Sequence, residues 1–456
     1  MTPPLLLTTE DQDLALIDIN TETDVETNTE TDVDADPETD VDTHSAQHAT
    51  THLIRQGGFG RGYGWPVWSP DGSRALVSYG WREAEGDPHL DLLSITIPQG
   101  ASGEPRFSNA EGHRQPIAPG VMHYAHWSPD GQRAIAVARS GGGLTLTLLA
   151  APATDAADAP DAPDPTDATD ATTLADPDPT AAWSANALID AAPMFCAWSP
   201  DGTQLAVHAG PQLVLFDPAA VAEPRRVLAD QSRFRTPAWS PDGEALYYAA
   251  PGTGQKDLLW RTQPQSGQRE IVTEVDGLTA ILASPAGADL ALLTLSAGGL
   301  GGRDLRLIDP TTPEPRFLER GNVLGAFWSP DGAALFIVSR AGLDLECRLA
   351  RYDIDSARSH ELARFHPSPA YSAYLAFFDQ YSLSHRLISA DGRWLCLGGI
   401  VAGNGAGKRP FAPQFGCYLL PTDGSAPPRR VADAEIAFFP PPTSPPTSPP
   451  AAQASD

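Results

Sequence analysis

The chain has 456 residues, of which 41% are hydrophobic, and its 58 acidic and 30 basic residues give a formal net charge of −28. This length allows one large all-β domain or two to three ordinary domains, and no stretch approaches the roughly 20 apolar residues of a membrane-spanning helix. Because nucleic acids and anionic membrane surfaces are bound through basic side chains, the acidic balance argues against both as partners.

The N-terminal segment contains three short apolar runs, which are typical of strands, at residues 5–9, 13–18 and 51–54. Residues 20–50 separate the second run from the third and hold ten acidic residues and no Lys or Arg. Such a composition cannot repay the entropy of ordering, so we predict a disordered acidic insertion. The segment lacks the basic and apolar regions of a secretory signal peptide, which predicts a cytoplasmic protein.

A five-residue motif, Trp-Ser-Pro-Asp-Gly, recurs along the rest of the chain. Its intact copies lie at residues 68–72, 127–131, 198–202, 239–243 and 328–332. Degenerate copies lie at 283–287 and 388–392. From residue 198 the copies follow one another after 41, 44 and 45 residues, which is the length of a four-stranded propeller blade.

Each repeat unit has the same pattern of four apolar runs, which we name strands A to D. Strand A ends at the Trp, and Ser-Pro-Asp-Gly forms a tight turn, because Pro fixes φ and Gly accepts a positive φ. In the unit that begins at Trp198, strands B, C and D are expected at residues 204–208, 213–216 and 226–228. Helical periodicity of useful length is absent, so the sequence predicts an all-β protein.

The five intact motifs resemble the propeller repeats of the TolB type, which also occur in the propeller domains of prolyl-oligopeptidase-type proteins. The resemblance covers nearly the whole chain outside the acidic tracts and implies a single β-propeller. It implies structural roles for the motif, in which the Trp packs between blades and the Asp ties the turn. Known TolB proteins are exported, and we do not carry that location over to this chain.

The two ends of the chain are predicted to close the ring in one shared blade. Residues 435–439 align with residues 324–328 and read as an additional strand A, for which the N-terminal runs supply strands B, C and D. This gives eight blades within residues 1–440, with seven as the alternative, and hides two sheet edges. Residues 441–456 read as a disordered, proline-rich tail.

A second acidic tract, residues 151–180, contains eight aspartates and no Lys or Arg. Like residues 20–50, it falls between strands C and D, so both tracts should leave from the side of the ring that carries the Ser-Pro-Asp-Gly turns. They read as disordered, solvating tethers, or alternatively as segments that attract cations or a basic partner.

The opposite side of the ring, built from B–C and D–A loops, is rich in arginine and aromatic residues. Such side chains are the usual anchors of interfaces, although here they could instead plug the mouth of the ring. The candidate binding residues are Arg61, Tyr63, Trp65, Trp81, Arg82, Arg233, Arg235, Arg303, Tyr374, Asp379, Tyr381, His385 and Arg386.

These features favour a non-catalytic binding or scaffolding protein that engages a protein, a peptide or a small acidic or aromatic ligand. No catalytic elbow, metal-ligand spacing or phosphate loop is present, so no cofactor or metal is predicted, and the four cysteines are expected to be buried and reduced. A monomer is expected. The alternative is a propeller enzyme of the lyase or hydrolase type, with His, Asp and Arg side chains at the channel mouth; His123, His126, His208 and His385 are its candidate histidines.

Overall fold

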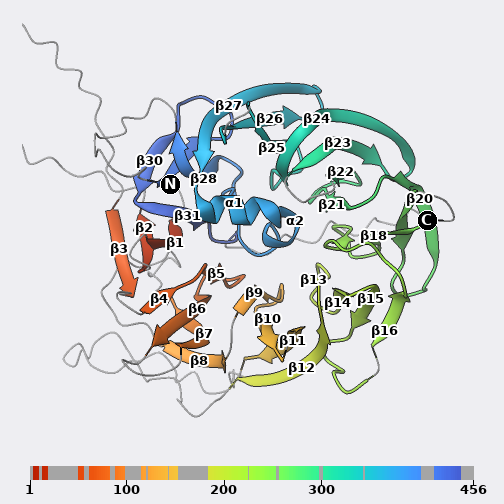
Figure 1. The fold of residues 1–456 in the computed structure, drawn as a ribbon, viewed down its shortest axis with the longest axis horizontal. Coiled ribbons are helices and arrows are strands. Elements are labelled where there is room, and N and C mark those ends of the chain that lie inside the picture. The colour runs from red at the N-terminus through yellow and green to blue at the C-terminus, as the bar shows by residue number, and fades with distance from the viewer. Residues whose placement is uncertain are drawn as a thin grey trace, which may run out of the picture.

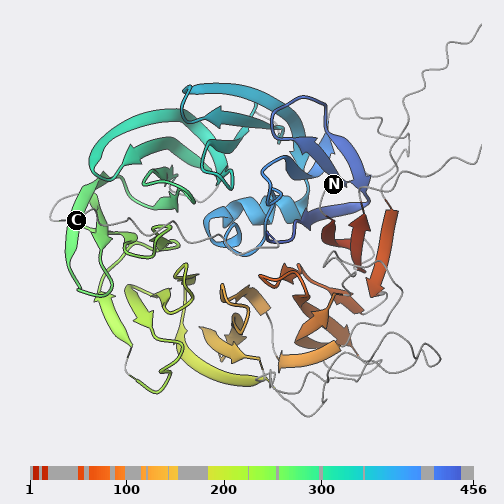
Figure 2. The same cartoon turned by 180° about the vertical axis from the view of Figure 1, so that it is seen from behind.

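The computed structural model describes residues 4–9, 13–18, 50–55, 61–82, 88–97, 114–119, 122–141, 143–151, 183–223, 225–252, 256–296, 301–342, 345–401 and 415–442. Antiparallel sheets form a ring, and two short helices lie inside it (Figure 1). The view from behind also places the helices within the ring (Figure 2). The molecule is therefore a β-propeller.

One sheet joins the two ends of the described chain. It has the order β3 (Thr50–Arg55), β2 (Leu14–Asp18), β1 (Leu5–Thr9) and β31 (Ala434–Phe438). Leu6 pairs with Phe438 and Leu7 with Ala437. The predicted closure of the ring by N- and C-terminal strands is therefore confirmed.

Four further sheets follow in chain order, each running from the inside of the ring outward. The first contains β4 (Arg61–Tyr63), β5 (Val67–Trp68), β6 (Arg74–Arg82), β7 (Pro88–Thr96) and β8 (Arg114–Pro119). The second contains β9 (Met122–Trp127), β10 (Arg133–Ser140), β11 (Gly143–Ala150) and β12 (Ser184–Ala191). The third contains β13 (Met194–Trp198), β14 (Leu205–Ala209), β15 (Gln212–Phe216) and β16 (Arg226–Ala229). The fourth contains β17 (Ala238–Trp239), β18 (Leu246–Pro251), β19 (Asp257–Thr262) and β20 (Arg269–Val275).

The remaining strands form one continuous ten-stranded sheet. Its strands are β21 (Thr279–Ala283), β22 (Leu290–Leu295), β23 (Gly302–Asp309), β24 (Thr312–Trp328), β25 (Ala334–Arg340), β26 (Cys347–Asp353), β27 (Arg358–Pro367), β28 (Trp394–Val401), β29 (Gly416–Pro421) and β30 (Arg429–Ala432). The sheet is continuous because β24 pairs with both β23 and β25, and because β27 pairs with both β26 and β28. If every motif copy starts a blade, this sheet holds three blades; the total of eight stays a prediction.

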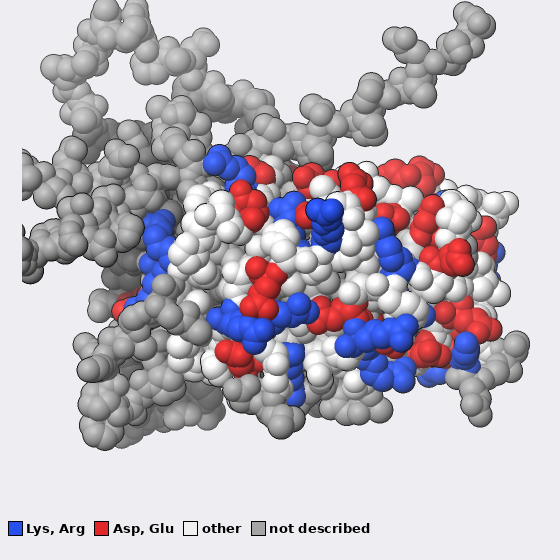
Figure 3. Space-filling model, turned by 90° about the horizontal axis from the view of Figure 1, so that it is seen from above, with Lys and Arg blue, Asp and Glu red and all other residues white. Residues whose placement is uncertain are grey.

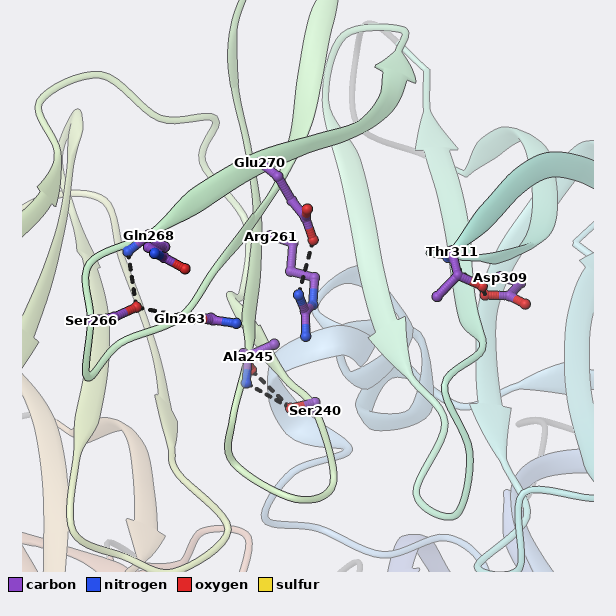
Figure 4. A network of polar contacts seen from close by, with 9 residues as sticks. All are labelled: Ser240, Ala245, Arg261, Gln263, Ser266, Gln268, Glu270, Asp309 and Thr311. Atoms are coloured by element: carbon purple, nitrogen blue, oxygen red, sulfur yellow. Dashed lines mark hydrogen bonds and ion pairs between the residues drawn. The ribbon is translucent and has the colours of Figure 1, made fainter.

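In six of the seven copies, the Ser and Asp side chains of the motif hold the turn in the same way. In the copy at 239–243, the Ser240 hydroxyl donates to an Asp242 carboxylate oxygen at 2.5 Å. The same hydroxyl accepts the Ala245 backbone N–H at 2.9 Å (Figure 4). Gly243 has a φ of 75°, in the left-handed region that favours glycine. In the copy at 328–332, the Ser329 hydroxyl holds the pKa of Asp331 below its ordinary value.

The motif tryptophans fasten neighbouring sheets to one another. In four copies the indole Nε1 donates to a backbone carbonyl of the preceding strand A at 3.1–3.2 Å, namely Trp68 to Phe438, Trp127 to Val67, Trp239 to Ala197 and Trp328 to Leu282. The first of these bonds crosses the closure between the chain ends. The packing role implied for the Trp and the turn role implied for the Asp are both confirmed.

The two sides of the ring follow from the strand registers, and we name them the turn face and the loop face. The turn face carries the Ser-Pro-Asp-Gly turns, and the loop face carries the B–C and D–A connections. Ala150 pairs with both Arg133 and Ser184, and the Ala151 N–H donates to the Gln132 carbonyl beside a motif turn. The described residues on either side of the second acidic tract therefore lie on the turn face, as predicted. Residues 20–49 and 152–180 of the two acidic tracts, and the tail beyond Pro442, lie outside the described residues.

All four cysteines are buried and free, as expected, and they lie in strands. The helices are α1 (Pro369–Ala376) and α2 (Phe378–Tyr381), neither of which was predicted from the sequence. No helix among the described residues is long and apolar enough to cross a membrane.

Candidate functional site on the loop face

The helical segment α1–α2 fills the centre of the ring, and we call it the plug. Its start is set by the sequence Ser-Pro, because the Ser368 hydroxyl accepts the Tyr371 N–H and Pro369 occupies the first helical position. A carboxylate oxygen of Glu435, in β31, accepts the Ala370 N–H at 2.9 Å. The plug is thus attached to the strand that closes the ring.

Two further contacts fix the other end of the plug. The Gln380 side chain accepts the Cys196 N–H and donates to the Cys196 carbonyl, both at 2.8 Å, as a strand neighbour would. The Asp379 carboxylate forms a buried ion pair with Arg235 and accepts the Thr236 N–H at 3.2 Å. The plug is therefore attached to β31, to β13 and to the connection between β16 and β17.

Several of the predicted binding residues instead form the contacts that hold the plug in place. Arg235 and Asp379, 6% and 2% exposed, pair with each other. Tyr374 is fully buried and stacks on Tyr381, with ring centroids 5.7 Å apart. The Tyr374 hydroxyl donates to the backbone carbonyl of His385, which is itself buried.

Trp65 and Tyr63 also contribute to packing. Trp65 meets Tyr381 edge-on at 5.1 Å and packs against the plug, while Tyr63 is buried beside Tyr79 with ring centroids 4.8 Å apart. These contacts support the alternative that the aromatic residues plug the mouth of the ring.

A large groove remains between the plug and the loops that follow β20, β22 and β25, with a volume of about 1130 Å³. Two of its lining arginines are Arg303, which was predicted, and Arg340, which was not. Its exposed apolar side chains are Leu345, Phe377 and Leu278, with exposed fractions of 71%, 45% and 36%. We call it the loop-face groove.

The arginines of the loop-face groove differ from those on the rim of the ring. On the side of the molecule seen in Figure 3, basic side chains are interspersed with acidic ones. Rim pairs include Arg348 with Glu319 at 2.7 Å and Arg364 with Glu361 at 2.8 Å. By contrast, neither Arg303 nor Arg340 has a carboxylate within ion-pair distance among the described residues.

The remaining predicted residues lie apart from this groove. Arg233 pairs with Asp257 through two hydrogen bonds of 2.6 and 2.7 Å. Arg386 lines a cavity that opens on the turn face. Three candidates, Arg61, Trp81 and Arg82, lie at described backbone positions in β4 and β6, but their side chains fall outside the described part of the structure.

Sequence reasoning missed the apolar part of the groove. Leu278 lies in a D–A loop and Leu345 in a B–C loop, and single apolar loop residues carry no signal of their own. Arg340 could have been predicted from its position at the end of a strand B, next to a loop on the loop face. Phe377 stands in an aromatic-rich connection, residues 366–385, but only the structure of the plug shows that it lines the groove.

No family model matches the sequence, and no curated protein matches it. Among solved structures, the chain is similar to the crystal structure of a eukaryotic initiation factor, with 9% identity and a TM-score of 0.51 over 97% of this chain and 99% of that one. It is also similar to prolyl endopeptidases, with 10% identity and a TM-score of 0.50 over 85% of this chain and 51% of that chain, so it spans about half of their length.

A third similar structure is TolB from Acinetobacter baumannii, with 14% identity and a TM-score of 0.37 over 67% of this chain. The match covers 64% of that TolB chain, which is less than two thirds of its length. At such identities, the likeness to the first two structures shows the propeller fold and nothing about chemistry.

Proposed function

We propose that this protein is a non-catalytic β-propeller that binds a partner protein through the loop-face groove. The bound element is a peptide segment that carries acidic residues together with a large apolar side chain. We further propose that its blades are of the TolB type, because the Trp-Ser-Pro-Asp-Gly turn is repeated along the chain.

The observation that carries the proposal is that one groove combines exposed apolar side chains with arginines that have no ion-pair partner in the described structure. Of the seven large hydrophobic residues that are exposed in the described structure, three line this groove: Leu278, Leu345 and Phe377. Grouped exposed apolar side chains mark interaction sites, whereas isolated ones do not. A volume of about 1130 Å³ exceeds that of most small-molecule pockets and suits a peptide segment.

Charge supports an acidic segment. The charged lining of the groove among the described residues consists of Arg235, Arg303, Arg340 and Asp276. Since Asp379 neutralises Arg235, two cations face one carboxylate. Arginine forks bind carboxylates through paired hydrogen bonds, so acidic side chains would complement the groove.

The same lining supports binding over catalysis. It offers one carboxylate, Asp276, and no histidine among the described residues. General acid–base catalysis usually needs two groups of matched pKa within hydrogen-bond reach of the substrate.

The test is selection from a random peptide library displayed on phage, followed by affinity measurements on the enriched peptides. We expect peptides rich in Asp or Glu with Leu or Phe, and at least tenfold weaker binding to Leu345→Glu and to the double variant R303E/R340E. Ile271→Glu, at an exposed apolar residue on the outer strand β20, should bind like the parent. The proposal would be refuted if basic peptides were enriched. It would also be refuted if peptide affinity were unchanged both in Leu345→Glu and in R303E/R340E.

A further inference from the structure

A second hollow, which we call the channel cavity, opens on the turn face and is separate from the loop-face groove. Its volume is about 370 Å³, within the range of small-molecule pockets. Its walls are the inner strands and motif turns of several sheets and include Trp198, Trp239 and Trp328. The plug and the strand segment after it close the cavity at its inner end and include Asp379, His385 and Arg386.

Arg386 breaks the repeat at this point. It stands two residues before the first residue of its motif copy, in the strand segment that bridges to Phe439. At the same position the five intact copies have Pro66, Ala125, Cys196, Pro237 and Ala326, and the copy at 283–287 has Ile281. The other copies thus have small or apolar residues at this position, whereas the copy at 388–392 has an arginine whose guanidinium lies in the channel.

No partner among the described residues compensates this charge. The side chain is exposed to the solvent of the cavity, yet it lies deep in the molecule, where desolvation lowers its pKa. The only carboxylate in the described lining is Asp379, which is already held by Arg235 and the Thr236 N–H. The nearby His126 is half-buried and His385 is buried, and desolvation lowers the pKa of each to about 3, so both are neutral at pH 7.

Unused hydrogen-bonding atoms point to the same conclusion. The Trp198 Nε1 is buried without a partner in the described structure, whereas four other motif tryptophans donate to a carbonyl. The His385 Nε2 is also buried and unpaired. The cavity therefore combines a cation and an unused donor with an apolar, aromatic wall.

We propose that the channel cavity binds a small monocarboxylate with an apolar or aromatic body, and that the Arg386 guanidinium holds the carboxylate. The aromatic wall accommodates the body of the ligand, and one negative charge balances the one unpaired positive charge. Paired hydrogen bonds from a guanidinium fork to a carboxylate supply the specificity. This site is independent of the proposed peptide groove, and either could exist without the other.

The test uses 3-phenylpropionate, indole-3-acetate and acetate as probes, with the neutral alcohol 3-phenylpropan-1-ol as the matched control. Calorimetry and the fluorescence of the cavity tryptophans report binding. We expect the two aromatic carboxylates to bind the full chain at least tenfold more tightly than the alcohol and than acetate.

Variants separate the role of the charge from the fold. Arg386→Met should weaken carboxylate binding at least tenfold, and Arg386→Lys should weaken it less, since a cation is retained. Because Arg386→Met removes an uncompensated charge from a deep site, its melting temperature in the absence of ligand should equal or exceed that of the parent. Arg303→Met, in the loop-face groove, should leave carboxylate binding unchanged.

Three results would overturn the proposal: no binding of any carboxylate probe at about 10 mM, equal binding of the alcohol, or unchanged carboxylate affinity in Arg386→Met. A fall in the melting temperature of Arg386→Met would show a structural role for the guanidinium and would also count against it.

Discussion

At the scale of single residues, the role of an arginine depends on the residues that surround it. Arg235 is buried and paired with Asp379, which fastens the plug. Arg303 and Arg340 have no ion-pair partner in the described structure and face a groove, and Arg386 faces the channel cavity. An uncompensated cation in a hollow marks a binding site more strongly than a rim arginine beside a glutamate.

The tryptophan bonds between sheets give a residue-scale prediction. Trp239→Phe should destabilise the protein by about 1 kcal/mol more than Trp198→Phe, because only Trp239 loses an indole hydrogen bond. The two tryptophans are similarly buried, at 8% and 6% exposure, so the change in ring size is matched. Urea unfolding of both variants measures the difference; equal losses would contradict it.

Buried histidines predict the response to acid. Desolvation lowers the pKa of His208 to about 4, and it is the largest cause of the similar shifts in His126 and His385. A neutral buried imidazole contributes its full stability above the unfolded pKa of about 6.5 and loses it as the pH falls toward the folded pKa. The melting temperature should therefore decline between pH 6.5 and 4.5.

This decline can be assigned to one residue. His208→Gln retains a donor for the Arg235 carbonyl and should show a shallower decline than the parent. His360→Gln, at an exposed position, should follow the parent. Identical slopes for all three proteins would show that other groups govern the acid response.

At the scale of elements, closure of the ring depends on short strands from opposite ends of the chain. Leu5, Leu6 and Leu7 in β1 are fully buried, and β1 pairs on one side with β2 and on the other with β31. Removal of residues 1–19 exposes this surface and leaves β31 without its neighbour.

We expect that deletion to lower the melting temperature by more than about 10 °C, because large apolar side chains each contribute about 1.5–3 kcal/mol on burial. Deletion of residues 443–456 is the control and should leave the melting temperature unchanged. A stable protein without residues 1–19 would show that the ring does not need β1.

The plug offers a second element-scale prediction. A Cβ at Gly325, in β24, would lie 3.1 Å from the Leu375 side chain and 3.3 Å from that of Phe378. Gly325→Val should therefore displace the plug, lower the melting temperature and weaken peptide binding, while the far-ultraviolet circular dichroism of the strands persists. Gly143→Val meets nothing within 4 Å and serves as the control; the same loss in both variants would argue against plug displacement.

At the scale of the whole molecule, the acidic tracts should be accessories to the fold. Ala150 and Ser184 are paired neighbours in β11 and β12, so the sheet is complete on both sides of the second tract. Replacing residues 153–179 with a short Gly-Ser linker should change the melting temperature by less than about 2 °C, because the cost of loop closure depends weakly on length. If the shortened protein aggregates, rescue by dilution or by changed salt concentration separates lost solubility from lost stability.

The sequence by itself determined what depends on local chemistry and on repetition. The Ser-Pro-Asp-Gly turns, the alternation of strands, the propeller and the pairing of 5–9 with 435–439 follow from motifs that act over a few residues and recur at blade spacing. The helix α1 was not predicted, because a helix of eight residues leaves little periodicity to detect, although Ser368-Pro369 is a typical helix start.

Only the tertiary structure decided which arginines and aromatic residues are free. Arg235 and Asp379 are 144 residues apart, and nothing in either local sequence indicates that one neutralises the other. The loop-face groove likewise gathers Leu278 from the connection after β20, Arg340 from the end of β25 and Phe377 from the plug. The physical reason is that turns and strands are set by neighbours in the chain, whereas the charge balance of a hollow is set by whichever distant side chains the closed ring brings together.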